Sequence, residues 1–481
     1  MGLGALNAPS SHSMTASVRF GISALQNGIP LISSWAKGSF SAFGVYLSRL
    51  GTANESASEA GSNYVLSKTF LSHTGKRSEG ELGKFLEQNC ATIVPNFAKE
   101  YAVLTAGFPA ANADALVGLL CEMLTDPLIL SQDIAQCSQI AEFELTQMLK
   151  LQPERILLDW VHFKAFGSNS TGLGNVLPLF AQNISALTPE KISGYLRRVV
   201  QPEALVLAAA EVSPSALAGS FGKLQINQPK QVDSKEENDS LHQHQNAQPD
   251  SKASRDKSPS ELTIPNPEPE SNEFTRLALA FPAASLTAPD YWTFAVITSL
   301  LGGGSSFSSG GPGKGMYSRL YTQVLNQYHW SESAQAFSFP YKNTGLFGIH
   351  GACVPGNAQK MLGVFFSQLA SIASASEAEV QRAKNQAKSA ILMALESRVG
   401  QVEYMAKQFD ASALSADTRR IATCAEISRA VEAVSMHDLQ RVSRQLLSEE
   451  SAPTVVMMDS REGKDSIPLS LICHLQSKYN K

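Results

Sequence analysis

The most unusual feature of this sequence is a glycine-rich segment between Leu301 and Trp330, LGGGSSFSSGGPGKGMYSRLYTQVLNQYHW. Seven of the fourteen residues from Gly302 to Gly315 are glycine. Each glycine inside a regular element costs roughly 0.5–1 kcal/mol relative to alanine, so this density is expected where bare backbone must approach another group closely. The apolar stretches WTFAVITSLL and MYSRLYTQVL flank the segment and predict a shaped loop between two structured elements.

Neither of the common phosphate-binding patterns fits this segment. A P-loop requires GxxxxGK followed by Ser or Thr, whose hydroxyl holds magnesium, but Gly313-Lys314 is followed by Gly315. The dinucleotide fingerprint GxGxxG also fails, because the spacing after Gly313 is wrong and the segment follows a predicted helix rather than a strand. We therefore disfavour nucleotide binding.

The elements that must position this loop fall into two halves. A chain of 481 residues is too long for one hydrophobic core. Residues 225–272 contain almost no apolar side chains and many Pro, Ser, Asn, Gln and charged residues, which predicts a disordered linker. The predicted organisation is an N-terminal tail or targeting remnant (1–17), an N-terminal domain (18–224), the linker, and a C-terminal domain with the glycine-rich loop (273–481).

Each half mixes strands and helices in a similar order. In the first half, VRFGISALQNGIPLISS predicts two strands around an Asn27-Gly28 turn, and residues 79–89 predict an amphipathic helix. The segment IVPNFAKEYAVLTAGFP predicts a strand, NADALVGLLCEMLTDP a helix, and EALVLAAAEV a buried strand. The second half continues with the strand FTRLALAFPA, a helix at 288–301, the strand GLFGIHGACV and two long helices. This order predicts a duplicated α+β unit.

Composition excludes several classes. The net charge of −4 gives no general footprint for nucleic acid, and no apolar run approaches the roughly 20 residues of a membrane-spanning helix. The six cysteines contain no CxxC pair and are expected to be reduced thiols, as in cytosol, mitochondrial matrix or nucleus. Residues 1–24 are rich in Ser and Ala, with one arginine and no acid, so an atypical presequence and a frayed start both stay open.

The glycine-rich segment also resembles a known family. GGGSSFSSGGPGKGMYSRLYTQVLNQYHW is similar to the glycine-rich loop of the alpha subunits of mitochondrial processing peptidases. NTGLFGIHG, EAEVQRAKNQAKSAILMALESR and ALQNGIPL also resemble those subunits, and the resemblance extends over about residues 18 to 450, interrupted by the linker. The wider family is that of the pitrilysin/insulinase-type zinc peptidases. It implies two similar α+β halves, each a mostly antiparallel sheet packed with helices, with a linker between them.

The same resemblance raises the question of zinc. Active members carry HxxEH on a helix, where the histidines bind the metal and the glutamate is the general base, and a later helix gives a third ligand. The matching stretch GSNYVLSKTFLSHTG has Tyr64, Ser67 and Lys68 in place of His, Glu and His. Glu142 or Glu144 falls near the place of the third ligand, but one carboxylate cannot make the site. We therefore expect neither zinc nor catalytic residues on this chain, a subunit of a metalloendopeptidase without its own HxxEH site.

The resemblance implies a role in handling substrate. Alpha subunits pair with a zinc-bearing beta subunit and contribute their glycine-rich loop to the recognition of basic, amphipathic presequences, in the mitochondrial matrix or at the matrix face of the inner membrane. Exposed backbone of such a loop can bond to an extended peptide of any sequence. The residues assigned to peptide contact are Gly302, Gly303, Gly304, Ser305, Phe307, Gly310, Gly311, Gly313, Lys314, Gly315 and Met316.

Two points stay open at this stage. No carboxylate lies between Gly302 and Arg319, so acidic contacts to presequence arginines are expected from elsewhere, with Glu332 one candidate, or from the partner. Arg319 and Tyr328 lie near positions where catalytic relatives hold substrate, but packing is equally expected for them. The alternative function is a structural core subunit of respiratory complex III, which resembles the same family, and the two roles coexist in some lineages. The seven glycines favour the peptidase role.

Overall fold

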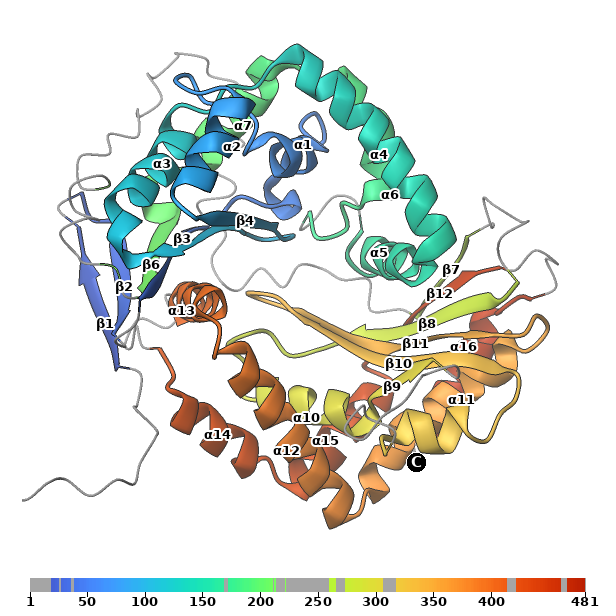
Figure 1. The fold of residues 1–481 in the computed structure, drawn as a ribbon. Helices are drawn as coiled ribbons and strands as arrows, with labels where there is room; N and C mark the ends of the chain where they lie inside the picture. Colours follow the sequence, from blue (N-terminus) through green and yellow to red (C-terminus); the bar gives the residue numbers. More distant parts are fainter. Residues whose placement is uncertain are drawn as a thin grey trace, which may run out of the picture.

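The computed structural model of the chain describes residues 19–25, 27–35, 39–167, 172–210, 212, 221, 259–264, 273–305, 317–412, 421–459 and 465–480. These residues form two six-stranded sheets with helices packed against them (Figure 1). The predicted α+β class with two similar halves is therefore confirmed. The predicted N-terminal tail, 1–17, lies outside the described residues.

The first sheet and its helices come from residues 19–210. Its strands are β1 (Arg19–Ala24), β2 (Pro30–Trp35), β3 (Phe40–Leu47), β4 (Thr92–Phe97), β5 (Ala102–Pro109) and β6 (Leu205–Ala210). Its helices are α1 (Ser62–Thr69), α2 (Glu79–Gln88), α3 (Ala113–Thr125), α4 (Ser131–Leu151), α5 (Pro153–Phe166), α6 (Leu177–Phe180) and α7 (Pro189–Val199). Short 3₁₀ turns are η1 (Thr52–Asn54), η2 (Ala110–Asn112), η3 (Ala181–Ala186) and η4 (Pro202–Ala204).

The second sheet and its helices come from residues 260–479. Its strands are β7 (Ser260–Ile264), β8 (Thr275–Pro282), β9 (Gly303–Ser305), β10 (Ser331–Pro340), β11 (Gly345–Cys353) and β12 (Thr454–Met458). Its helices are α10 (Tyr291–Leu301), α11 (Ala358–Ser371), α12 (Glu377–Ala394), α13 (Arg398–Ser412), α14 (Cys424–Ala433), α15 (Met436–Leu447) and α16 (Leu469–Tyr479). A π-helical segment, η5 (Tyr321–Leu325), and a 3₁₀ turn, η6 (Ile372–Ser374), complete the half.

The two sheets share one topology. The strand orders are β1-β2-β6-β3-β5-β4 and β7-β12-β8-β11-β10-β9. In the first sheet β6 runs parallel to β2 and antiparallel to β3. In the second, β12 runs parallel to β7 and antiparallel to β8. The strands β2-β6-β3-β5-β4 therefore correspond to β7-β12-β8-β11-β10, which confirms the predicted duplication, while β1 and β9 are additions at opposite ends.

Two sequence predictions are wrong in detail. The segment IVPNFAKEYAVLTAGFP forms a hairpin, β4 and β5, rather than one strand, because the backbone turns at Lys99 and Glu100 and the Ala98 N–H donates to the Tyr101 oxygen at 2.8 Å. Strand β7 lies inside the segment predicted to be disordered. Its Leu262 and Ile264 pack against a hydrophobic cluster, and the polar residues between them hide this alternation from a composition argument. The rest of the predicted linker, 225–258 and 265–272, lies outside the described residues.

The halves exchange one helix each across their sheets. Helix α13, from the second half of the chain, packs under the first sheet, where Val402, Met405 and Phe409 contact apolar side chains of β2, β3 and β6 (Figure 1). Helix α5, from the first half, packs on the second sheet, where Ile156 and Val161 contact β8, β10, β11 and β12. The inner face of each sheet is therefore covered by a helix from the other half of the chain.

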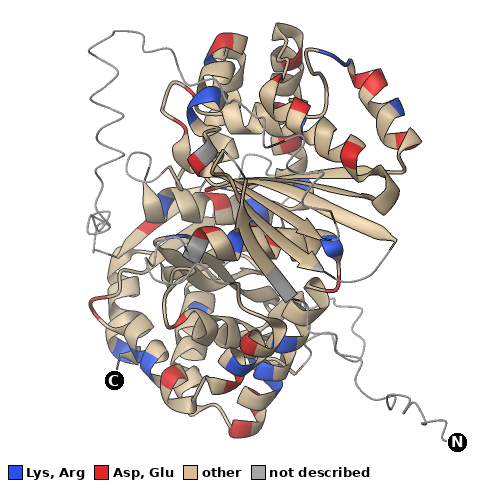
Figure 2. Ribbon diagram, turned by 90° about the vertical axis from the view of Figure 1, so that its left-hand side faces the viewer, with Lys and Arg blue, Asp and Glu red and all other residues tan. Residues whose placement is uncertain are grey.

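The surface is mixed in charge. Figure 2 shows Lys and Arg interspersed with Asp and Glu over the helices, with no face of a single sign in that view. This distribution agrees with the small net charge of −4. Within the part of the chain that the structure describes, no helix is both long and apolar enough to cross a membrane.

Candidate functional site

Helix α1 carries the three positions that were compared with a metal-binding motif. It begins at Ser62, after Gly61 in a left-handed conformation with φ of 99°. Its first turn is held by Glu55, whose two carboxylate oxygens accept the N–H groups of Asn63 at 2.6 Å and Gly61 at 3.3 Å. Burial raises the pKa of Glu55 to about 8, although these two N–H groups oppose the shift. A buried acid therefore fixes the start of α1.

Tyr64 and Lys68 lie one turn apart on α1 and share one partner, Glu144 of α4. The Lys68 ammonium lies 2.5 Å from Glu144 Oε1, and the Tyr64 hydroxyl donates to Glu144 Oε2 at 2.8 Å. The ammonium also lies 5.2 Å from the centre of the Tyr64 ring. Burial, followed by the hydrogen bond to Glu144, raises the pKa of Tyr64, so its hydroxyl stays protonated. We call Tyr64, Lys68 and Glu144 the α1–α4 cluster.

The other two candidates take no part in this cluster. The Ser67 hydroxyl turns back and donates to the Tyr64 carbonyl oxygen at 2.6 Å, so it is used by its own helix. Glu142 is exposed on α4, two residues before Glu144 and therefore on a different side of that helix. Of the two glutamates considered from the sequence, the structure brings only Glu144 to α1.

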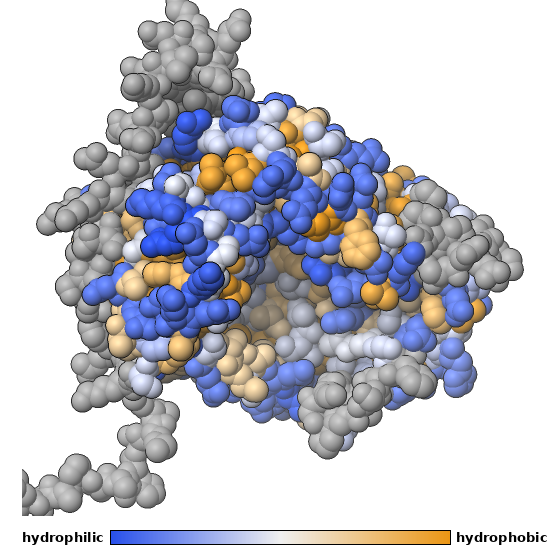
Figure 3. Space-filling model, turned by 45° about the horizontal axis from the view of Figure 1, so that its top comes forward, coloured by the Kyte–Doolittle hydropathy of each residue, from blue (hydrophilic) through white to orange (hydrophobic). Residues whose placement is uncertain are grey.

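A cavity of about 420 Å³ opens beside the α1–α4 cluster. It is lined by Tyr64, Ser67, Lys68, Glu144, Met148, Arg155, Asp159 and Leu177, from α1, α4, α5 and the start of α6. The space-filling view in Figure 3 shows the molecular face hollowed near its centre. The charged side chains that line the cavity are two cations, Lys68 and Arg155, and two carboxylates, Glu144 and Asp159.

The zinc implied by the family resemblance does not fit these residues. Both oxygens of Glu144 are engaged by donors from α1, and a protonated lysine is a cation where a ligand would have to stand. Within the described ranges, no group of three or more His, Cys, Asp or Glu side chains is arranged to hold a metal ion. In the α1–α4 cluster, Glu144 instead forms an ion pair with Lys68 and accepts a hydrogen bond from the Tyr64 phenol.

The first residues of the glycine-rich segment are tightly constrained. We call residues 302–305, together with Ser318 and Arg319 at the other end of the segment, the neck. Gly302 follows α10 with φ of 54°, and its carbonyl accepts the Ala336 N–H at 2.9 Å. Gly303, Gly304 and Ser305 then form β9, antiparallel to β10. Gly303 has φ of 102°, and a Cβ there would lie 2.0 Å from the Ala334 oxygen, so only glycine fits. By contrast, a Cβ at Gly304 would meet nothing within 4 Å.

The downstream end of the segment is anchored by Ser318 and Arg319. The Ser318 hydroxyl accepts the Gly303 N–H at 3.0 Å and so ties the two ends of the segment together. Arg319 is 4% exposed and donates to both oxygens of Glu379 at 3.1 Å and to the Ser371 hydroxyl at 2.8 Å. Burial opposes ionisation of Glu379, but the bonds from Arg319 and Ser376 lower its pKa to about 2. Arg319 is thus a packing residue, one of the two roles expected for it.

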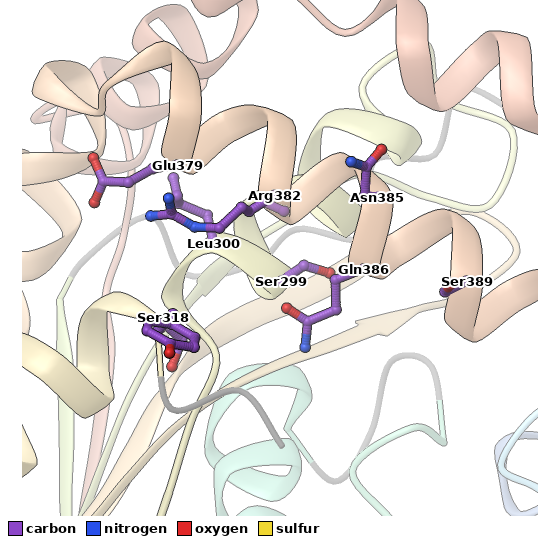
Figure 4. Close-up of a pocket in the computed structure, with 10 residues that line it drawn as sticks. Ser299, Leu300, Ser318, Glu379, Arg382, Asn385, Gln386 and Ser389 are labelled. Atoms are coloured by element: carbon purple, nitrogen blue, oxygen red, sulfur yellow. The ribbon is translucent and has the colours of Figure 1, made fainter. Parts of the chain in front are cut away.

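A second cavity, of about 370 Å³, lies at this neck between α10 and α12. Ser299 and Leu300 precede the glycine-rich segment, Tyr317 and Ser318 follow it, and α12 forms the other wall. Figure 4 shows Arg382 and Gln386 extending from α12 toward α10. The Tyr317 side chain is 77% exposed. The neck therefore presents an aromatic ring and polar side chains beside the glycines.

The structure describes part of the predicted peptide-contact set. Gly302, Gly303, Gly304 and Ser305 are at the neck as stated. The remaining predicted contacts lie outside the described residues: Phe307, Gly310, Gly311, Gly313, Lys314, Gly315 and Met316. Sequence reasoning missed Ser318 and Glu379. The pattern Ser376-Glu377-Ala378-Glu379 signals a capping box, which the structure contains, but nothing local signals that Glu379 also binds a buried arginine.

Comparison with known proteins gives consistent matches over most of the chain. The family described as "Insulinase (Peptidase family M16)" matches residues 31–178, and "Peptidase M16 inactive domain" matches residues 187–387. A "Probable mitochondrial-processing peptidase subunit alpha" of Schizosaccharomyces pombe is 30% identical, over 88% of this chain and 81% of that protein. "Mitochondrial-processing peptidase subunit alpha" is 28% identical in Neurospora crassa, over 92% of this chain and 87% of that protein. The human protein of that name is also 28% identical, over 89% of this chain and 79% of the human protein.

The fold has a counterpart among solved structures. A protease from Helicobacter pylori superimposes with a TM-score of 0.75 over 92% of this chain and all of that chain, at 14% sequence identity. At this identity the similarity concerns the fold alone. The overall fold is thus shared with a bacterial protein of distant sequence.

Proposed function

Because the chain belongs to the insulinase family of peptidases (peptidase family M16), we propose that it is a non-catalytic, substrate-recognising alpha-type subunit of a mitochondrial presequence peptidase. In this proposal a zinc-bearing beta-type partner supplies the hydrolytic chemistry, and this chain binds presequences of imported precursors in the mitochondrial matrix. The names of its relatives, subunits alpha of the mitochondrial-processing peptidase, support this choice within the family.

The α1–α4 cluster supports the non-catalytic part of the proposal. A metal-dependent hydrolytic site needs metal ligands and a general base that is free to accept a proton. Here Glu144 is paired with Lys68 and Tyr64, and Ser67 is bonded to its own helix. The proposal therefore places the zinc on the partner.

The observation that carries the peptide-handling role is the neck of the glycine-rich segment. Both ends of the segment are fixed, by the Gly303–Ser318 bond and by the burial of Arg319 against Glu379 and Ser371. Half of the residues from Gly302 to Gly315 are glycine, and a glycine has no side chain to cover its backbone donors and acceptors. Two ends anchored in this way suit a loop that contacts an extended peptide while its ends stay in place.

The test is cleavage by a reconstituted pair. The full chain is combined with an HxxEH-bearing beta subunit, and cleavage of a presequence-containing precursor is measured for the pair and for each chain alone. We expect cleavage only by the pair. Deletion of residues 302–315 should reduce both cleavage and the affinity for a fluorescent presequence peptide. Cleavage by the partner alone at the rate of the pair would refute the proposal.

A matched pair of glycine variants sharpens this test. Gly303→Ala places a Cβ against the Ala334 oxygen and disrupts the neck, whereas a Cβ at Gly118 of α3, outside the glycine-rich segment, meets nothing within 4 Å. We expect Gly303→Ala to raise the Kd for the presequence peptide several-fold and Gly118→Ala to change it little. Equal peptide binding by both variants, with both folded, contradicts a role for the neck.

A further inference from the structure

The two sheets differ at both pairs of corresponding edges, and one of these differences concerns β4 and β10. Strand β10 of the second sheet is covered on its outer side by β9, the first strand of the glycine-rich segment. Strand β4 occupies the corresponding place in the first sheet, where no strand among the described residues pairs with its outer side. An uncovered edge strand is a template for an added strand from another polypeptide. At this end the second sheet finishes with the three-residue strand β9, whereas the first sheet finishes with the six-residue strand β4.

The hydrogen-bond pattern of the β4–β5 hairpin fixes which residues face the free edge. The Ala98 N–H donates to the Tyr101 oxygen at 2.8 Å, so this pair is a hydrogen-bonded one. Antiparallel pairs alternate between hydrogen-bonded and non-hydrogen-bonded. Pro95 pairs with Leu104, three positions along the ladder from the Ala98–Tyr101 pair, so this pair is a non-hydrogen-bonded one. The backbone N and C=O of Pro95 therefore point away from β5. Ile93, Pro95 and Phe97 face the free edge.

Proline at the centre of this row changes what the edge can do. It has no N–H to donate, and its ring occupies the space where an incoming strand would place a carbonyl oxygen. In the middle of a six-residue strand, this removes the central one of three outward-facing donors. We propose that Pro95 closes the free edge of β4 to strand addition, so that an extended polypeptide cannot extend the first sheet there.

The surroundings of β4 show why this edge needs closing. Val94 is 47% exposed, so the strand presents an apolar side chain as well as backbone. Phe97 of β4 packs against Phe70 at the end of α1, with ring centres 6.2 Å apart, so the edge lies beside the helix of the α1–α4 cluster. A peptide added to β4 would lie next to a cluster with no free catalytic group. Closing the edge leaves the peptide to other surfaces.

The experiment restores the missing donor in the full chain. Pro95→Thr supplies an outward N–H on a residue that favours strands. The probe is a fluorescein-labelled 12-residue peptide of alternating arginine and threonine, followed by fluorescence anisotropy and by amide hydrogen exchange of residues 92–97. The control is Pro109→Thr at the end of β5, a strand that lies between β3 and β4 and has no free edge.

We expect Pro95→Thr to bind the peptide at least about 2- to 10-fold more tightly than the wild type, because it gains one net hydrogen bond and loses the obstructing ring. We also expect the peptide to protect residues 92–97 of this variant from exchange. The wild type and Pro109→Thr should show no protection of that segment by the peptide. Concentration-dependent dimers of Pro95→Thr alone in sedimentation would also support the proposal, because a second copy can supply the added strand.

Two results would overturn it. One is protection of residues 92–97 by the peptide in the wild type, which needs no variant to fold. The other is a folded Pro95→Thr with unchanged affinity and unchanged exchange. The inference is independent of the proposed function: loss of cleavage in the reconstituted pair leaves it standing, and an open β4 edge in the wild type leaves peptide handling by the glycine-rich segment standing.

Discussion

Glu144 is the residue on which the α1–α4 cluster depends, because each of its oxygens serves a different side chain of α1. The side chains of Lys68 and Glu144 are 34% and 29% exposed, so water partly screens the electrostatic attraction between them. Such partly exposed pairs contribute on the order of 1 kcal/mol. The cluster is therefore a modest structural tie between the two helices α1 and α4.

A double-mutant cycle measures this tie. Lys68→Met should lower the free energy of unfolding by about 1 kcal/mol, because it leaves the Glu144 carboxylate with the Tyr64 hydroxyl alone. Adding Glu144→Gln should cost less in the Lys68→Met background than in the wild type, with a coupling energy of about 0.5–1 kcal/mol in urea unfolding. The control is the pair Lys388–Glu432, whose glutamate is 47% exposed, so its coupling should be smaller. Strict additivity of Lys68→Met and Glu144→Gln would show that the ion pair does not stabilise the fold.

Glu55 predicts a dependence of stability on pH. Its pKa is raised to about 8 in the folded chain, mainly by burial, from a usual value near 4.5. The folded state therefore holds this proton more tightly than the unfolded state. The stability that Glu55 contributes is fully present below about pH 4.5 and is lost as the pH rises to about 8.

Glu55→Gln cannot titrate and should remove this dependence. The free energy of unfolding of the wild type minus that of the variant should fall by about 2–4 kcal/mol between pH 5 and pH 8.5. Urea unfolding at several pH values measures the difference, and the lost bond to the backbone adds only a constant offset. Parallel curves for the two proteins would refute the raised pKa.

At the scale of elements, helix α13 lies on the first sheet at a distance that one glycine permits. A Cβ on Gly44 of β3 would lie 2.3 Å from Val402 Cγ1 of α13, so Gly44→Ala must push the helix away. We expect a loss of about 1–3 kcal/mol, the usual cost of overpacking. Gly118→Ala on α3 is the matched control, because a Cβ there meets nothing within 4 Å, and it should be neutral or stabilising. Equal melting temperatures for the two variants would contradict the close contact.

Elements with local signals could be predicted from the sequence. The Asn27-Gly28 turn between β1 and β2 follows from a residue pair that accepts positive φ, and Gly28 has φ of 82°. Helix α2 follows from its spacing of apolar residues and from Ser78 and Glu81, which form a capping box. The strand β7 could not be predicted, because only its pairing with β12, almost two hundred residues later, turns SELTI into a strand. The coverage of each sheet by the other half's helix depends on similarly distant partners.

In the candidate site, too, some features could be predicted from local sequence and others depend on residues far away in the chain. The resemblance to the HxxEH motif directs attention to Tyr64, Ser67 and Lys68 from the sequence alone, but the choice of Glu144 over Glu142 needed the relative rotation of α1 and α4. The glycine-rich segment was recognisable from composition alone. Its anchoring by Ser318 and Arg319 was not, because Arg319 is exposed or buried according to where α11 and α12 pack.

At the scale of the whole molecule, the exchange of α5 and α13 predicts that the halves stay together without a covalent link. A protease site engineered between residues 225 and 258 allows the chain to be cut between the two sheets. Because α5 contributes to the cluster on the second sheet and α13 to the cluster on the first, the two fragments should co-elute in size-exclusion chromatography and separate only in denaturant. Separation of folded fragments in native buffer would contradict the prediction.

The late position of α13 also sets an order in time for a chain that is synthesised, or threaded across a membrane, from its N-terminus. On the first sheet, the side chains of Ile32, Tyr46 and Val206 pack against α13, a helix that begins about 190 residues after β6 ends. They cannot be buried until that helix has been made. Until then the first sheet carries a bare apolar face, which is the kind of surface that chaperones bind. The first half of this protein therefore finishes folding only when the last third of the chain has emerged.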